Sequence, residues 1–250
     1  MNKLFENHIP ITKPWIGIEE WEALKEIVLS GWVSLGPKVQ EFEESLASFI
    51  GVKYAVATNS CTSAIHLALR LHGVKAGDEV IVPDFTCMAD ANAVIMAGAI
   101  PVFADINENT FNIDPQKVVE LVTEKTKAIL IVDQIGLPAD LDVFIEIARK
   151  YNLALVDDAA TSLGASYKGK YLGSHGLTTT FSFHPRKMIT TGEGGMLVTD
   201  NCEIAENAKI LRSTGASVSD LERHKAKGII LQKYYVNGYN YRMTDIQAAI

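Results

Sequence analysis

Two stretches near the N-terminus carry apolar residues at the three- to four-residue spacing of an amphipathic helix. The first runs from Ile18 to Val28 and is followed by Gly31. The second begins at Pro37 and ends before Gly51, and a proline at the start with a glycine past the end is typical of a helix. We therefore predict two helices, each with one buried face, preceded by an extended arm up to Pro14.

From residue 54 onward, short runs of β-branched and apolar residues alternate with stretches of helical spacing. The predicted strands are 54–58, 79–82, 100–105, 128–132 and 153–157, and the predicted helices are 62–71, 87–97, one opened by Asp114-Pro115, and 141–151. Such alternation indicates a mostly parallel sheet with helices on both faces. The predicted fold class is therefore α/β, with ligands bound at the carboxyl ends of the strands.

One lysine, Lys187, lies between two further predicted strands, 178–183 and 196–198, and a glycine-rich turn, Gly192 to Gly195, precedes the second of them. The strands on both sides hold such a lysine in place. If its amine is partly removed from water, the neutral form is favoured and can form a Schiff base with a carbonyl compound. An ordinary solvated loop lysine is the alternative.

Polar residues follow two of the other strands. Asn59 to Ser63 open a helix, whose free N–H groups can hold a phosphate, although serine and threonine at that position also serve as ordinary helix caps. Asp157 and Asp158 end an apolar strand. A buried carboxylate there needs a positively charged partner, such as a protonated pyridine nitrogen, whereas an acidic start of the following helix is the alternative.

Composition and charge exclude several classes of protein. The 250 residues are 48% hydrophobic and 21% charged, as in a globular protein, and the net charge of -7 without a basic run argues against a nucleic-acid or membrane-surface partner. No apolar run is long enough to span a bilayer. Three cysteines without paired spacing predict neither disulfides nor a metal site. We expect a cytoplasmic protein with reduced thiols.

The stretch Ser-Phe-His-Pro-Arg-Lys at 182–187, followed by Thr-Thr-Gly-Glu-Gly-Gly at 190–195, resembles the cofactor-lysine segment of the DegT/DnrJ/StrS sugar aminotransferases. The resemblance extends from about Trp32 to Ile250. It implies a fold-type-I, aspartate-aminotransferase-like large domain that binds pyridoxal 5'-phosphate. On this basis residues 1–31 are an arm and helix, and residues 32–250 form the cofactor-binding domain.

The resemblance also implies roles for individual residues. Lys187 carries the cofactor and moves a proton, and Asp158 contacts the pyridine nitrogen. The other implied contacts are with the cofactor phosphate (Thr62, Ser63, Ser182 and, from the neighbouring subunit, Asn240), with the ring (Cys87 and Thr161) and with the substrate (His184, for which a merely structural role is the alternative). Three positions depart from the family pattern: Cys61 stands where glycine is usual, Cys87 where an aromatic residue is usual, and Thr161 where glutamine is usual. Phe85, two residues before Cys87, is expected in the core.

The activity that the resemblance implies is transfer of an amino group, from glutamate, to a keto group of a nucleotide-linked deoxysugar by a homodimer with shared sites. Sugar dehydratases of the same family have histidine in place of Lys187, which argues against that activity here. A non-catalytic binding protein of the same fold is the other alternative. Thr244 and Gln247 form a capping-box pattern, so a last helix begins there, and the family's small C-terminal domain is expected to be missing.

Overall fold

The structure, a computed structural model, describes residues 10–218, 223, 226 and 228–250. Its centre is a sheet in which seven described strands follow the order β1-β9-β8-β5-β4-β2-β3. Their bounds are β1 (Tyr54–Thr58), β2 (Glu79–Pro83), β3 (Ile100–Ala104), β4 (Thr126–Val132), β5 (Ala154–Asp158), β8 (Thr178–Ser182) and β9 (Gly195–Thr199). Only β9 among these runs antiparallel to its neighbours, so the predicted mostly parallel sheet is confirmed.

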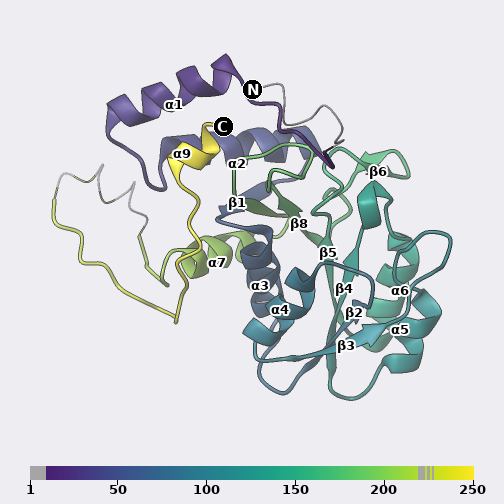
Figure 1. Cartoon of the computed structure of the whole chain (residues 1–250). Coiled ribbons are helices and arrows are strands. Elements are labelled where there is room, and N and C mark those ends of the chain that lie inside the picture. The colour runs from purple at the N-terminus through teal and green to yellow at the C-terminus, as the bar shows by residue number, and fades with distance from the viewer. Residues whose placement is uncertain (1–9, 219–222, 224–225, 227) are drawn as a thin grey trace.

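Helices cover both faces of this sheet (Figure 1). On one face lie α3 (Cys61–Leu71), α4 (Met88–Met96) and α7 (Cys202–Arg212), and on the other lie α2 (Pro37–Ile50), α5 (Pro115–Leu121) and α6 (Leu141–Tyr151). Because each strand is buried on both faces, its apolar residues alternate between two cores. In β4, Ile129 and Ile131 join the core under α2 and α6, whereas Ala128 and Leu130 join the core under α3 and α4.

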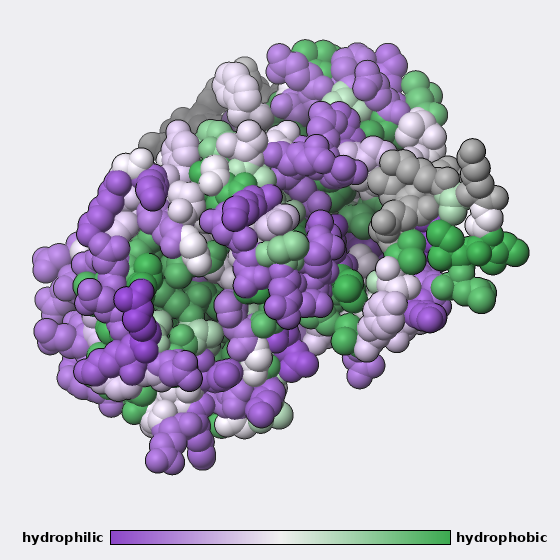
Figure 2. Space-filling view, turned by 180° about the vertical axis from the view of Figure 1, so that it is seen from behind, coloured by the Kyte–Doolittle hydropathy of each residue, from purple (hydrophilic) through white to green (hydrophobic). Residues whose placement is uncertain are grey.

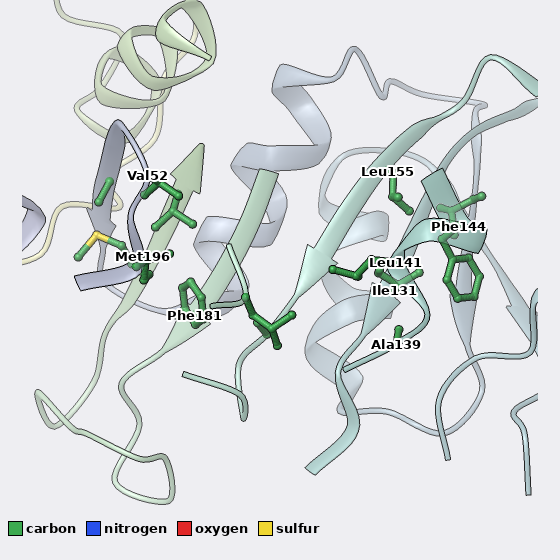
Figure 3. Packing of buried hydrophobic residues seen from close by; sticks show 14 of the residues in the cluster. Val52, Ile131, Ala139, Leu141, Phe144, Leu155, Phe181 and Met196 are labelled. Carbon is green, nitrogen blue, oxygen red and sulfur yellow. The ribbon is translucent and has the colours of Figure 1, made fainter. Parts of the chain in front are cut away.

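The core beneath α2 and α6 is filled by large side chains from several elements (Figure 3). Phe144 of α6 and Phe181 of β8 are among its largest buried members, and Leu141 packs there beside Ile131. Burying each such side chain contributes about 1.5–3 kcal/mol relative to leaving it in water. This packing fixes the sheet whose carboxyl ends carry the polar residues.

The ends of the helices follow the predicted signals. The glycines Gly31 and Gly51 adopt left-handed conformations after α1 (Ile18–Ser30) and α2. Asp114 caps α5 through the N–H of Gln116, and Thr244 forms the predicted capping box at the start of α9 (Asp245–Ala248). The first nine residues of the predicted arm lie outside the described residues.

One helix and one small pair of strands in this fold were not predicted from the sequence. The first, α7, is capped by Asn201, whose side chain accepts hydrogen bonds from the N–H groups of Glu203 and Ile204. The second is a small antiparallel pair of strands, β6 (Ser166–Tyr167) and β7 (Lys170–Tyr171). Predicted helix starts also differ by one residue: α3 begins at Cys61 rather than Thr62, and Cys87 is the N-cap of α4 rather than its first residue.

The C-terminal helix α9 contacts the start of helix α2 near the N-terminus. Asp245 is buried, and its carboxylate accepts hydrogen bonds from the N–H groups of Gly36, Lys38 and Val39 at the start of α2. Residues 228–236 lie away from the sheet (Figure 1) and expose apolar side chains, with Ile229 96% and Leu231 84% exposed. Figure 2 shows hydrophobic atoms gathered at that edge of the molecule.

Candidate active site at the carboxyl edge of the sheet

The predicted site residues follow strands that point the same way. β1, β2, β4, β5 and β8 are mutually parallel across the sheet, so the residues after them meet at one edge. Asn59 to Ser63 follow β1, Asp133 follows β4, Asp158 ends β5, and Ser182 ends β8. The sheet therefore brings together groups that are far apart in the sequence.

Lys187 lies in a turn just beyond β8 and is half-buried. Its backbone N–H donates to the carbonyl of His184 at 2.8 Å, and the loop is fastened again where the hydroxyl of Thr190 donates to the carbonyl of Phe183 at 2.8 Å. Gly192 follows with φ +80°, a backbone conformation that favours glycine over residues with a side chain. The positive charge of Lys187 lowers the pKa of Asp158, which places these two side chains at one site.

Asp158 is buried, and burial is the main reason that its pKa is raised above the ordinary value. The N–H of Ala160 donates to its Oδ1 at 2.9 Å, and the thiol of Cys61 donates to the same oxygen at 3.6 Å. These donors, together with Lys187, oppose the effect of burial. Hydrogen bonds thus hold the carboxyl group of Asp158 in place, and the positive charge of Lys187 favours its ionised form.

The start of α3 lies next to β9. Ser60 caps the helix by accepting from the N–H of Ser63 at 3.2 Å, and the hydroxyl of Ser63 donates to the side chain of Asn59 at 2.7 Å. The N–H groups of Cys61 and Thr62 have no hydrogen-bond partner among the described residues. Ser63 is therefore occupied within the cap, whereas backbone donors at the same helix end are available to a ligand.

Ser182 and His184 lie between β8 and the lysine. Ser182 is buried, and its hydroxyl oxygen accepts from the N–H of His184 at 3.4 Å. The Nδ1 of His184 accepts from the N–H of Arg186 at 3.2 Å, so one ring nitrogen serves the loop itself. The contact between His184 and a substrate stays a prediction.

The three remaining predicted residues are exposed. Cys87 caps α4, Thr161 donates its hydroxyl to the carbonyl of Asp133 at 3.0 Å, and Asn240 accepts through its carbonyl from the side chain of Asn59. Phe85 is also 47% exposed and packs on Phe111 with ring centroids 5.6 Å apart. Its predicted place in the core was wrong, because the chain after β2 leads it out of the sheet into a contact with a surface loop.

Two buried acids near Asp158, Asp90 of α4 and Asp133 after β4, were not predicted from the sequence. Both are fully buried, as is the predicted Asp157. Asp133 could have been found by the same signal as Asp158, because each follows an apolar strand. Asp90 gave no such signal, since it occupies the first turn of a helix, where an acidic residue is ordinary.

Asp133 and Asp157 form a buried carboxyl pair. The N–H of Ala139 donates to Asp133 Oδ1 at 2.7 Å, and the hydroxyl of Thr179 donates to Asp157 Oδ2 at 3.1 Å. The other oxygen of each carboxyl has no conventional donor among the described residues. Burial raises the pKa of Asp133 to about 7 and that of Asp157 well above its ordinary value, and the charge of Asp133 raises the pKa of Asp157 further. The pair therefore holds a proton to a higher pH than an isolated carboxyl group would.

In the described ranges, no group of three or more His, Cys, Asp or Glu side chains could hold a metal ion. Nor is any described helix long and apolar enough to cross a membrane.

Comparison with known proteins gives a consistent result. Residues 14–250 match the model of the DegT/DnrJ/EryC1/StrS aminotransferase family. The chain is 44% identical over 245 residues to the spore coat polysaccharide biosynthesis protein SpsC of Bacillus subtilis, covering 98% of this chain and 63% of SpsC.

Two solved structures illustrate the similarity of fold. PseC of Helicobacter pylori, an aminotransferase involved in the biosynthesis of pseudoaminic acid, superposes with a TM-score of 0.89 at 33% identity, covering 97% of this chain and 64% of PseC. The PLP form of the putative sugar aminotransferase Spr1654 of Streptococcus pneumoniae superposes with a TM-score of 0.86 at 32% identity, covering 96% of this chain and 64% of that one.

The chain thus spans a little under two thirds of the length of these relatives. Within that span the match is continuous from residue 14 to residue 250 and includes the lysine turn, the start of α3 and the end of β5. This chain therefore belongs to the DegT/DnrJ/EryC1/StrS aminotransferase family.

Proposed function

We propose that this chain is the cofactor-binding part of a pyridoxal-phosphate-dependent aminotransferase that moves an amino group from an amino acid, glutamate, to a keto group of a nucleotide-linked deoxysugar. The observation that carries the proposal is that Asp158 is buried at the carboxyl edge of the sheet, where the positive charge of Lys187 lowers its pKa. Membership of the aminotransferase family and the likeness to a PLP-form structure support it. The relatives named above support a sugar substrate.

The residues at this edge fit pyridoxal phosphate by their chemistry. A buried carboxylate suits a protonated ring nitrogen, an amine from a half-buried lysine suits the aldehyde carbon, and unpaired N–H groups at a helix start suit a phosphate. When bound, the cofactor supplies an electron sink for the bond being broken. Asp158 would hold the ring nitrogen, and the N–H groups of Cys61 and Thr62 with the hydroxyl of Ser182 would hold the phosphate.

Lys187 and Asp158 would have different roles in the proposed reaction. Lys187 would hold the aldehyde carbon of the cofactor through its Nζ, and the same amine, when free, would move the proton that leaves the substrate carbon. Asp158 keeps the ring nitrogen protonated, because a carboxylate beside that nitrogen favours its charged form. Cys87 and Thr161 lie in the loops that follow β2 and β5 at this edge of the sheet, and we assign them to contacts with the ring face and the ring edge.

Replacing Lys187 tests the proposal. Lys187→Ala should lose both the borohydride-fixed cofactor on that residue and the conversion of cofactor to its amine form by an amino donor, because the amine that performs both is gone. Mass spectrometry after reduction locates the label, and Lys170→Ala, an exposed lysine of β7, is the matched control. A label on another lysine, with conversion retained in Lys187→Ala, would refute the assignment.

We also propose that two copies share each site, with Asn240 of one subunit reaching the phosphate held by the other. The exposed side chain of Asn240 and the exposed apolar residues at 229–236 support a second copy as partner. Mixing Lys187→Ala with Asn240→Ala subunits should restore activity, because one site of each hybrid dimer is then intact. At random mixing the ceiling is about a quarter of wild-type activity. No recovery after verified subunit exchange would refute shared sites.

A further inference from the structure

Asp90 is a buried acid with an incomplete set of hydrogen bonds. It lies in the first turn of α4 with no exposed surface, and its Oδ2 accepts from the hydroxyl of Thr86. Its other oxygen, Oδ1, is buried and has no conventional donor among the described residues. A buried carboxylate oxygen without a hydrogen-bond partner destabilises the fold, and a proton on the Asp90 carboxyl would relieve that cost.

The carboxyl of Asp90 lies beside that of Asp158. Burial raises the pKa of Asp90 well above its ordinary value, and the neighbouring charge of Asp158 raises it further. Asp90 in turn lowers the pKa of Asp158. Two adjacent buried carboxylates cannot both stay ionised, so the proton belongs on Asp90 and the charge on Asp158.

We propose that Asp90 is a positioning residue of the cofactor site, which keeps its proton on Oδ1 and donates it to Asp158, so that Asp158 stays an oriented carboxylate toward the ring nitrogen. This inference rests on the proposed function. It explains how the buried Asp158 can remain charged before a protonated ring nitrogen reaches it. A hydrogen bond to the ionised form favours that form, and Asp90 supplies one without adding a second charge.

Three other titratable side chains near Asp90 and Asp158 affect the pKa values of these two acids. On the side of α3, the thiol of Cys61 donates to Asp158 and is itself held neutral, because burial raises its pKa. Beyond β8, the charge of Lys187 favours ionised Asp158. The residue before α4, Cys87, raises the pKa of Asp90 if it ionises, which also keeps the proton on Asp90.

Asp133 and Asp157 are the other titratable groups close to Asp158. Ionised Asp158 raises the pKa values of both Asp133 and Asp157, so these acids also prefer to hold a proton when Asp158 is charged. None of these groups can replace the donor that Asp90 presents, because the thiol is a weaker donor and the lysine acts only through its charge.

The test compares variants of Asp90 that keep or lose a donor. Asp90→Asn keeps an N–H₂ donor and an acceptor for Thr86, whereas Asp90→Leu fills the volume without a donor. Affinity for pyridoxal phosphate is measured by fluorescence quenching between pH 6 and pH 8.5. Asp90→Leu should bind the cofactor more weakly than wild type toward pH 6, by up to about tenfold for each unit by which the pKa of Asp158 rises, because the ionised fraction of Asp158 below that pKa falls by this factor. Wild type and Asp90→Asn should show no such added pH dependence.

A second measurement does not depend on how well Asp90→Leu folds. The infrared band of protonated carboxyl groups in the apoprotein at pH 7 should lose one carboxyl's intensity in Asp90→Asn. An unchanged band, or equal pH profiles for wild type and both variants, overturns the inference while leaving the proposed function standing. If wild type itself takes no pyridoxal phosphate, the proposed function fails and this inference fails with it.

Discussion

Replacing Asp133 with asparagine should change how the stability of the fold depends on pH. Asp133 is fully buried after β4, and burial raises its pKa to about 7 from the ordinary 3.8. Because the folded-state pKa lies above the unfolded value, the folded state binds more protons between these two pH values. The stability that this proton contributes is complete below the unfolded pKa and is lost as pH rises through the folded pKa.

The size of the effect follows from the two pKa values. The full shift corresponds to about 4 kcal/mol at 1.36 kcal/mol per unit, and the part that falls between pH 5 and pH 8 is about 2.5 kcal/mol. Asparagine resembles the neutral acid in shape, keeps an acceptor for the N–H of Ala139, and does not titrate. The free energy of unfolding of Asp133→Asn, relative to wild type, should therefore rise by about 2.5 kcal/mol between pH 5 and pH 8.

Urea unfolding of the apoprotein at pH 5, 6, 7 and 8, followed by circular dichroism, measures this difference. Asp84→Asn is the control, because Asp84 is an exposed acid that follows β2 at the same edge of the sheet, and its difference from wild type should stay nearly constant. A wild-type minus Asp133→Asn difference that is flat across this range would show that Asp133 is ionised throughout, and the argument for a proton shared with Asp157 would then fail.

Two other predictions concern the site and the packing behind it. Asp158→Asn should reduce turnover far more than cofactor retention, because the phosphate and the lysine still hold the ring while its charge is no longer supported; a larger loss of turnover in Asp157→Asn would reverse the assignment of the two acids. Gly195→Ala should destabilise the fold by about 1–3 kcal/mol, since an added Cβ would lie only 2.6 Å from the carbonyl oxygen of Ser60, and Gly228→Ala, with open space around it, is the control in a thermal melt. Equal melting temperatures for these two glycine variants would contradict the packing argument.

The arrangement of the sheet was predictable because its physical cause is local. A strand buried on both faces must be apolar at consecutive positions, as β4 is, and this pattern is visible in the sequence alone. Helix ends were predictable for the same reason, because a cap such as Asp114 or Thr244 acts on N–H groups two or three residues away. The antiparallel direction of β9 was not, since strand pairing depends on the path of the whole chain.

The site was predictable only in part, because burial of an acid depends on what packs against it. The likeness of 182–195 to a family segment pointed to Lys187, and a separate likeness at the end of the strand 153–157 pointed to Asp158. The sequence could not indicate that Asp90 faces Asp158, because the contact joins helix α4 to strand β5, with no spacing rule between them. The prediction for Phe85 was wrong in the opposite sense. An aromatic residue after a buried strand suggested a place in the core, whereas the turn after the strand exposes its side chain.

The buried acids at this edge form two pairs with different tasks. In each pair, one carboxyl can hold the proton, so the enclosed edge carries less charge than its number of acids suggests, and backbone N–H groups from Ala139 and Ala160 bind Asp133 and Asp158. Of these four acids in the described part of the chain, Asp158 is the one whose pKa is lowered by a nearby cation, Lys187. That asymmetry selects Asp158 as the acid that keeps its charge. A ligand with a protonated nitrogen would then replace the missing solvation of that charge, which ties binding of such a ligand to the stability of the fold.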